Sequence, residues 1–213
     1  AWQFDMRGNC VYVAREKEGY QERFSKDDAG LRRLRCTVNY GGFVWINMND
    51  QPVSMLEEWA GPAMSAIEVQ LNSVPLEVAH YHKEYVEHGY KAEALEFLSG
   101  AKHGSLFNFG HCAITANDDD TVKQNVLADF PKPDTKGTHK IHLFPGYVFD
   151  ITGPVLHVKV VTPVDANRIM IEHRGLMPQG ENKTDRDTRT KYYNLNHGPF
   201  RISAVKPKEG SQP

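Results

Sequence analysis

Residues 140–176 read KIHLFPGYVFDITGPVLHVKVVTPVDANRIMIEHRGL, and this stretch decides the fold class. It divides into three strand-like runs, which turn-rich segments at 152–154 and 163–167 separate: 140–149, 155–162 and 168–176. Short successive strands joined by turns favour antiparallel pairing. With a further run at 105–115, this half of the chain is predicted to form an antiparallel meander.

Upstream of the meander the pattern is mixed. Pro75 precedes a run whose alternation predicts a strand over 76–83, with His80 and His82 on one face. A short helix is predicted over roughly 90–98. Ser54 and Glu57 have the spacing of a capping box, which predicts a helical turn there, and Gly61-Pro62 ends that turn.

The first fifty residues have a different character. Trp2 and Phe4, a break at Gly8-Asn9 and the run 10–13 predict a β-hairpin. The continuous apolar stretch 43–48 suggests a strand buried on both faces. Because the pattern becomes helical after residue 50, we place a domain boundary there and assign the chain to the α+β class. Residues 181–197 are predicted to be a surface helix or loop, and 201–213 a disordered tail.

Composition excludes several classes of protein. Lys and Arg total 25 against 27 Asp and Glu, giving a net charge of -2, and no basic stripe could follow a phosphate backbone. Nucleic acid is therefore not an expected partner. No apolar run reaches the eighteen or so residues that a membrane span needs, so we expect no membrane association and a cytoplasmic location. Cys10, Cys36 and Cys112 form no C-x-x-C pair, which argues against a disulfide framework.

The chain has ten histidines, and two pairs are candidate metal ligands. His80 and His82 share a strand face and could bind one metal, although hydrogen bonding to neighbours on a half-buried sheet face is the favoured explanation. His103 and His111 flank a Gly-containing segment with no recognised ligand spacing. Alternation places Glu172 and His173 on opposite faces, so these two cannot meet. The acidic run 117–120 is read as a solvated turn.

Three collinear stretches resemble the large subunit of the Rieske non-haem iron ring-hydroxylating oxygenases. The segment 1–9 (AWQFDMRGN) is similar to the one that follows the second Cys-x-x-His pair of a Rieske domain. Residues 30–48, followed by Gly61-Pro62, resemble the closing strands of that domain and the linker after it. Residues 141–176, together with Gly198-Pro199-Phe200, resemble the sheet of the catalytic domain. Within the family, these stretches most resemble the methanesulfonate monooxygenase type of hydroxylase.

The resemblance implies a domain plan. Residues 1–50 would be the C-terminal end of a Rieske β-domain, and 51–200 a partial helix-grip catalytic domain, built from an antiparallel sheet plus helices. The chain would then be a fragment or an internally deleted version of a large subunit. The activity implied is that of a mono- or dioxygenase, which uses NAD(P)H-derived electrons and O2 to hydroxylate an aromatic or small organic substrate, sulfonates included.

The resemblance also implies cofactors, and here the sequence departs from the family. The full-length parent would carry a 2Fe-2S cluster and a mononuclear Fe(II), but the cluster ligands would precede Ala1. Residues 86–91 resemble the approach to the iron motif, yet the second histidine and the carboxylate of the facial triad are missing. Neither cofactor site is expected to be complete, and the segment alone is expected not to turn over. No catalytic residue is assigned, and His80 and His82 become structural on this reading.

Partners and alternatives complete the sequence-based hypotheses. The family implies a reductase, a ferredoxin in some systems, a small β subunit in others, and a homotrimeric large subunit. Two other readings stay open. One is a non-catalytic helix-grip module that binds a small ligand. The other is a metal enzyme that uses the His80-x-His82 strand pair.

Overall fold

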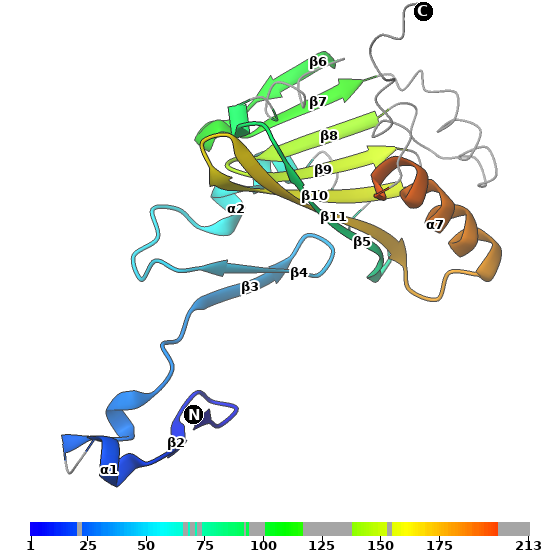
Figure 1. Cartoon of the computed structure of the whole chain (residues 1–213). Coiled ribbons are helices and arrows are strands. Elements are labelled where there is room, and N and C mark those ends of the chain that lie inside the picture. The colour runs from blue at the N-terminus through cyan, green and yellow to red at the C-terminus, as the bar shows by residue number, and fades with distance from the viewer. Residues whose placement is uncertain are drawn as a thin grey trace, which may run out of the picture. The chain divides into compact units, whose positions relative to one another are not determined.

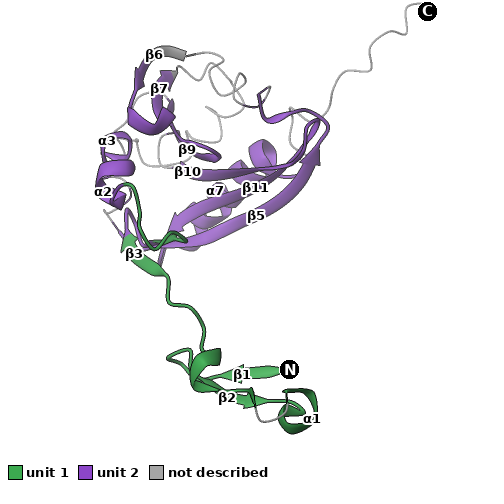
Figure 2. Cartoon of the chain, turned by 90° about the vertical axis from the view of Figure 1, so that its left-hand side faces the viewer, with its two compact units in different colours: residues 1–38, 44–53 green, residues 39–43, 54–213 purple. Residues whose placement is uncertain are grey.

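The computed structural model describes most of the chain in two compact units, residues 1–38 with 44–53, and residues 39–43 with 54 onward (Figure 2). The described residues are 1–20, 23–65, 68, 71, 74–91, 93, 101–116, 138–152 and 155–199. None of the helices within these ranges is long and apolar enough to cross a bilayer.

The first unit begins with the predicted hairpin. Strands β1 (Trp2–Phe4) and β2 (Cys10–Val13) pair antiparallel, and Gly8 takes a positive φ of 86° in the turn between them. The Asp5 carboxylate accepts hydrogen bonds from the backbone N–H groups of Arg7 and Asn9, which fixes the turn. Two short helical segments follow, α1 (Glu16–Tyr20) and η2 (Asp27–Ala29).

The strand predicted over 43–48 forms, but its burial was predicted wrongly. Strands β3 (Arg35–Asn39) and β4 (Phe43–Asn47) make a two-stranded sheet of their own. The side chains of Val44 and Ile46 are 62% and 59% exposed. An apolar run is compatible with burial on both faces, but such burial also requires other elements packed against each face of the strand.

Two short helices open the main part of the second unit, α2 (Leu56–Trp59) and α3 (Gly61–Met64). The predicted capping box does not form, since Met55 occupies the cap position of α2 and no side chain caps that helix. Pro62 stands in the first turn of α3, where its missing N–H costs nothing. Ala60, Ala63 and Met64 are fully buried.

A seven-stranded antiparallel sheet dominates this unit, in the order β5-β11-β10-β9-β8-β7-β6 (Figure 1). Its strands are β5 (Leu76–Val86), β6 (Ala101–Leu106), β7 (Cys112–Ala116), β8 (Thr138–Leu143), β9 (Tyr147–Thr152), β10 (Val155–Asp165) and β11 (Arg168–Pro178). The meander is thus confirmed, and the early strand β5 pairs with the last strand β11 along its whole length.

Two predicted strands prove to be hairpins. The run 105–115 is broken by the turn η3 (Asn108–Gly110), where Phe109 and Gly110 both have positive φ. The run 140–149 is broken between β8 and β9 at Phe144-Pro145-Gly146. Each break occurs at a residue that cannot continue a strand ladder. In the first break it is Phe109, with its left-handed backbone, and in the second it is Pro145.

The polar segment 181–197 is helical and is not confined to the surface. Helix α7 (Lys183–His197) starts at Asn182, whose side chain accepts from the Asp185 N–H at 3.0 Å. Arg189, Tyr192 and Tyr193 are buried where the helix lies against β5 and β11 (Figure 1). Of the helix predicted over 90–98, only Tyr90, Lys91 and Glu93 are described, and the acidic run 117–120 and the tail 201–213 lie outside the described residues.

Candidate functional site

One face of the large sheet carries a row of polar side chains. Residues directly opposite on adjacent antiparallel strands point to the same side of a sheet. The pairing register aligns His82 with His173, then Lys159, Val148 and His142 across five strands. A second row beside it runs from His80 through Gly175, His157 and Asp150 to Lys140. We call this side of the sheet the histidine face.

The opposite side of the sheet is apolar at β8 and β9. Phe149 and Ile141 are almost fully buried there, and the ring of Phe43 packs edge-on against Phe149 at 5.5 Å. Sequestered apolar area on this side stabilises the sheet by about 25 cal/mol per Å². At these strands the histidine face is thus backed by a buried apolar layer.

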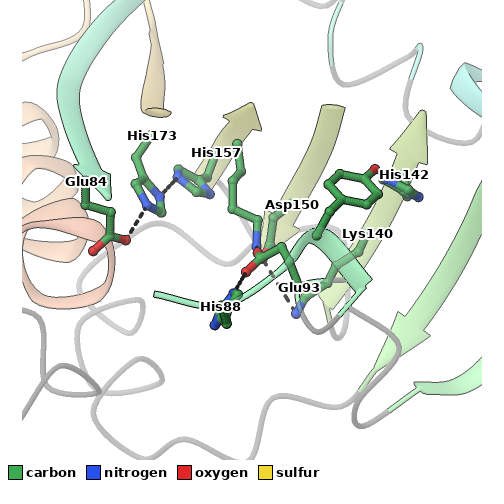
Figure 3. A network of polar contacts seen from close by, with 10 residues as sticks. Glu84, His88, Glu93, Lys140, His142, Asp150, His157 and His173 are labelled. Carbon is green, nitrogen blue, oxygen red and sulfur yellow. Dashed lines mark hydrogen bonds and ion pairs between the residues drawn. The ribbon is translucent and has the colours of Figure 1, made fainter. Parts of the chain in front are cut away.

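A hydrogen-bonded chain crosses the histidine face near α7. The Glu84 carboxylate lies 3.0 Å from Nε2 of His173, and Nδ1 of His173 lies 3.1 Å from Nε2 of His157 (Figure 3). An ionised carboxylate only accepts, so His173 donates from Nε2, and its Nδ1 accepts from His157. Glu84 therefore determines that both His173 and His157 carry their proton on Nε2.

Further imidazoles stack on this chain. The ring of His82 lies 5.9 Å from that of His173, and the ring of His197, the last residue of α7, lies 3.6 Å from that of His157. Complete burial lowers the pKa of His157 well below its usual value, and its histidine neighbours lower it further. His157 is therefore neutral at neutral pH, the form in which imidazole binds metals.

A second polar cluster lies nearer the middle of the sheet. The Glu93 carboxylate forms an ion pair with Lys159 and accepts from His88 at 3.1 Å (Figure 3). Burial alone would raise the pKa of Glu93, but Lys159 and His88 outweigh it, so the pKa lies below its usual value. The hydroxyl of Tyr90 lies 3.3 Å from Nε2 of His142 nearby.

His80 and His82 do share one face, as alternation predicted. The ring of His80 stacks on Tyr193 at 5.8 Å, and its buried Nε2 has no hydrogen-bond partner among the described residues. Burial lowers the pKa of His80. His82 faces His173 instead. Their role as ligands stays a prediction.

Of the other predicted pair, His103 and His111, the structure describes the side chain of His111 alone. His111 accepts from the Phe144 N–H at 2.9 Å through Nδ1, and its ring lies 4.7 Å from that of Trp59 in α2. The backbone of His103 belongs to β6, but its side chain lies outside what the structure describes. Their role as metal ligands also remains a prediction.

Glu172 and His173 lie on opposite faces, which confirms the argument from alternation. Glu172 accepts from the Tyr81 hydroxyl at 2.7 Å and pairs with Arg174 and Lys83. The hydrogen bond from Tyr81, with help from the two cations, lowers the pKa of Glu172 to about 2. This carboxylate belongs to the outer side and has no part in the histidine face.

The grouping that sequence reasoning missed is His157, His173 and His197. The nitrogen ligand atoms of these three residues all lie within 4.8 Å of one another, and no other group of three or more His, Cys, Asp or Glu among the described residues is spaced to bind a metal. Sequence separations of 16 and 24 residues match no metal motif, because the register of β10 and β11 and the end of α7 create the grouping.

Two characterised relatives are similar to the chain along nearly all its length. The hydroxylase alpha subunit of methanesulfonate monooxygenase from Methylosulfonomonas methylovora is 40% identical over 94% of this chain and 54% of its own. The alpha subunit of 2-aminobenzenesulfonate 2,3-dioxygenase from Alcaligenes sp is 25% identical over 93% of this chain and 57% of its own. The chain thus spans about half the length of these relatives. No family model matches the sequence.

Solved structures agree on the fold. Naphthalene 1,2-dioxygenase with indole bound superposes with a TM-score of 0.69 at 16% identity, covering 95% of this chain and 57% of that one. A quaternary ammonium Rieske monooxygenase in complex with γ-butyrobetaine gives a TM-score of 0.64 at 18% identity, covering 91% and 54%. At these identities the likeness concerns the fold alone.

Proposed function

The chain belongs to the large-subunit family of the Rieske oxygenases over the half of the subunit that it spans, and on this premise we propose that it serves in the hydroxylase component of such an oxygenase. That component would use O2 and electrons from NAD(P)H to hydroxylate an organic substrate. The observation that carries the proposal is the 40% identity to a hydroxylase alpha subunit along 94% of the chain.

We assign the two units to two domains of that subunit. Residues 1–50 would be the end of the Rieske domain, and 51–200 a partial helix-grip catalytic domain. The boundary between compact units near residue 53 supports this division, as does the antiparallel sheet of the second unit with α7 packed against it.

Rieske oxygenase alpha subunits carry a 2Fe-2S cluster and a mononuclear iron, and neither ligand set fits the residues described. The first unit contains Cys10 and Cys36 but no histidine, whereas a Rieske cluster needs two of each. His88, in the stretch that resembles the iron motif, is bound to Glu93. Within the described ranges no two-histidine, one-carboxylate group is spaced for iron. No reaction step through either group is therefore assigned to this chain.

We assign organosulfonates as the substrate class. Both relatives are named for sulfonate substrates, one aliphatic and one aromatic. A sulfonate is a permanent anion, and the histidine face carries two cations, Lys140, which lies 3.9 Å from Asp150, and Lys159, which is paired with Glu93. These lysines would orient the anionic end by charge-assisted hydrogen bonds.

The partners proposed are those of the family: a reductase, a ferredoxin or small β subunit in some systems, and further copies of the large subunit as a trimer. A reductase is required because hydroxylation by O2 consumes two electrons that the organic substrate does not supply.

Calorimetric titration tests the substrate class. The chain is titrated with methanesulfonate and 2-aminobenzenesulfonate, and with acetate and 2-aminobenzoate as matched carboxylates. We expect the sulfonates to bind more tightly, and Lys140→Met to weaken them, with exposed Lys183→Met as the control. Equal affinity for the carboxylates, or binding only of an uncharged aromatic such as naphthalene, would overturn the assignment.

Turnover is tested separately. When the chain is mixed with reductase, NADH and methanesulfonate, without the rest of a large subunit, we expect no substrate-dependent oxygen uptake. One equivalent of iron in the purified chain together with such uptake would contradict this.

A further inference from the structure

His157, His173 and His197 come together from three different elements. His157 is the third residue of β10, His173 lies diagonally across from it on β11, and His197 ends α7. His157 and His173 are buried, with 4% and 6% of their surface exposed, and His197 is half-buried. Three imidazoles in one small volume are unusual in a core, because apolar side chains would fill it without polar atoms to satisfy.

The spacing of two of these rings already suits a metal. His157 Nε2 and His173 Nδ1 lie 3.1 Å apart. Two nitrogens bound to one ion at about 2.1 Å each lie about 3.0–3.4 Å apart for octahedral or tetrahedral angles. The observed distance falls in that range, so an ion could replace the hydrogen bond with little backbone movement.

Glu84 supplies the outer partner that metal-binding histidines usually have. Its carboxylate binds Nε2 of His173 at 3.0 Å, so the nitrogen of His173 that accepts from His157 is Nδ1, the atom that an ion would take over from this hydrogen bond. A carboxylate in this position fixes the tautomer and the orientation of the ring, and makes the nitrogen a better ligand.

His197 must turn for all three to bind. Its ring is parallel to that of His157 within 7°, at 3.6 Å, and a metal lies in the plane of each ring that binds it. His197 is the least buried of the three and stands at the helix end, and turning its ring would break its stacking on His157 and its ring contact with Tyr192 at 6.1 Å.

We propose that His157, His173 and His197 form a binding site for a divalent transition metal ion, with Glu84 as the positioning residue of His173. Imidazole ligands suit Zn²⁺, Fe²⁺, Ni²⁺ and Cu²⁺, and three protein ligands leave a coordination position for water or an anion. When the ion binds, the proton of His157 moves from Nε2 to its other ring nitrogen, so that both rings act as neutral ligands.

This site goes beyond the proposed function and does not depend on it. None of the three histidines belongs to the stretch that resembles the family's iron motif, residues 86–91. The test below measures metal binding alone, so the site can fail while the oxygenase assignment holds, and the reverse.

The experiment is a metal titration of the chelator-treated chain. We expect Zn²⁺ to bind at one equivalent by calorimetry and Co²⁺ to give the visible absorption of a nitrogen-ligated ion. His197→Gln, the substitution least able to disturb the core, should lower the affinity at least tenfold, and Glu84→Gln by about 10–100-fold. His139→Gln is the matched control, since His139 lies on β8 outside the group.

Three outcomes would overturn the proposal. The first is the absence of metal binding by a chain whose circular dichroism shows it folded. The second is unchanged affinity in both His197→Gln and Glu84→Gln. The third is affinity that survives these changes but disappears in His80→Gln with His82→Gln, which would place the ion on the strand pair instead.

Discussion

The ring of Tyr193 lies directly over Gly175, so closely that a Cβ on Gly175 would come within 2.7 Å of three ring carbons. Helix α7 therefore approaches β11 at a distance that only glycine permits. Gly175→Ala is expected to destabilise the chain by roughly 1–3 kcal/mol, because a methyl group must push the helix outward. Urea unfolding measures the change. Gly104→Ala, where the nearest atom lies at 3.5 Å, is the control and should cost less than about 0.5 kcal/mol.

The hydroxyl of the same tyrosine binds the sheet. It lies 2.7 Å from the Leu156 carbonyl oxygen and 2.6 Å from that of Leu176. Tyr193→Phe removes the donor from two buried acceptors, and we expect a loss of about 1–3 kcal/mol in unfolding free energy. Exposed Tyr85→Phe on β5 should change it by less than about 0.5 kcal/mol. Equal losses in the two variants would show that the hydroxyl contributes nothing.

Glu93 should make stability depend on pH. Its pKa in the folded chain lies below the ordinary value of 4.5, so its contribution is fully present above that pH and is lost as the pH falls through the folded pKa. Glu93→Gln should cost roughly 1–3 kcal/mol at neutral pH, and the difference from the parent should shrink in acid. Thermal unfolding across this range provides the measurement. Exposed Glu87→Gln should show no such convergence, and a gap that stays constant in acid would rule out the ion pair as its cause.

Arg189 and Glu181 form a buried ion pair at the start of α7. The two side chains are 4% and 8% exposed, and Nη2 of Arg189 lies 2.6 Å from Oε1 of Glu181. Arg189→Met should cost about 3–5 kcal/mol because Glu181 is left buried without its partner. In a double-mutant cycle with Glu181→Leu, the double variant should be less destabilised than the sum of the single variants. The exposed pair Arg186 and Glu77 should contribute about 0–1 kcal/mol.

Local patterns predicted much of the sheet. The strands at 76–83, 155–162 and 168–176 form where alternation and turn residues placed them, and Glu172 and His173 separate to opposite faces for the same reason. The runs 105–115 and 140–149 are predicted as single strands and are each broken by a turn: Phe109 gives no sign of the first turn, whereas Pro145-Gly146 marks the second. The burial of 43–48 was predicted wrongly, since the layer that would cover it is not encoded in the strand itself.

The histidine group could not be predicted from spacing. His157 meets His173 because Lys159 pairs with His173 across β10 and β11, and that register depends on the whole length of both strands. His197 joins them because the packing of Tyr193 on Gly175 fixes where α7 ends. Both the register and the position of α7 are set by tertiary packing, and the three histidines stand 16 and 24 positions apart in the sequence.

The pairing of β5 with β11 also bears on how the chain acquires its structure. Residues 76–86 pair with residues 169–178, so β5 cannot pair until a strand about ninety residues further along the chain has been synthesised. Contacts this distant in sequence slow folding to milliseconds or longer, because a long loop must close before any pairing is gained. During synthesis the backbone groups of β5 remain without that neighbour until β11 has left the ribosome, and in that interval the nascent strand is open to chaperones.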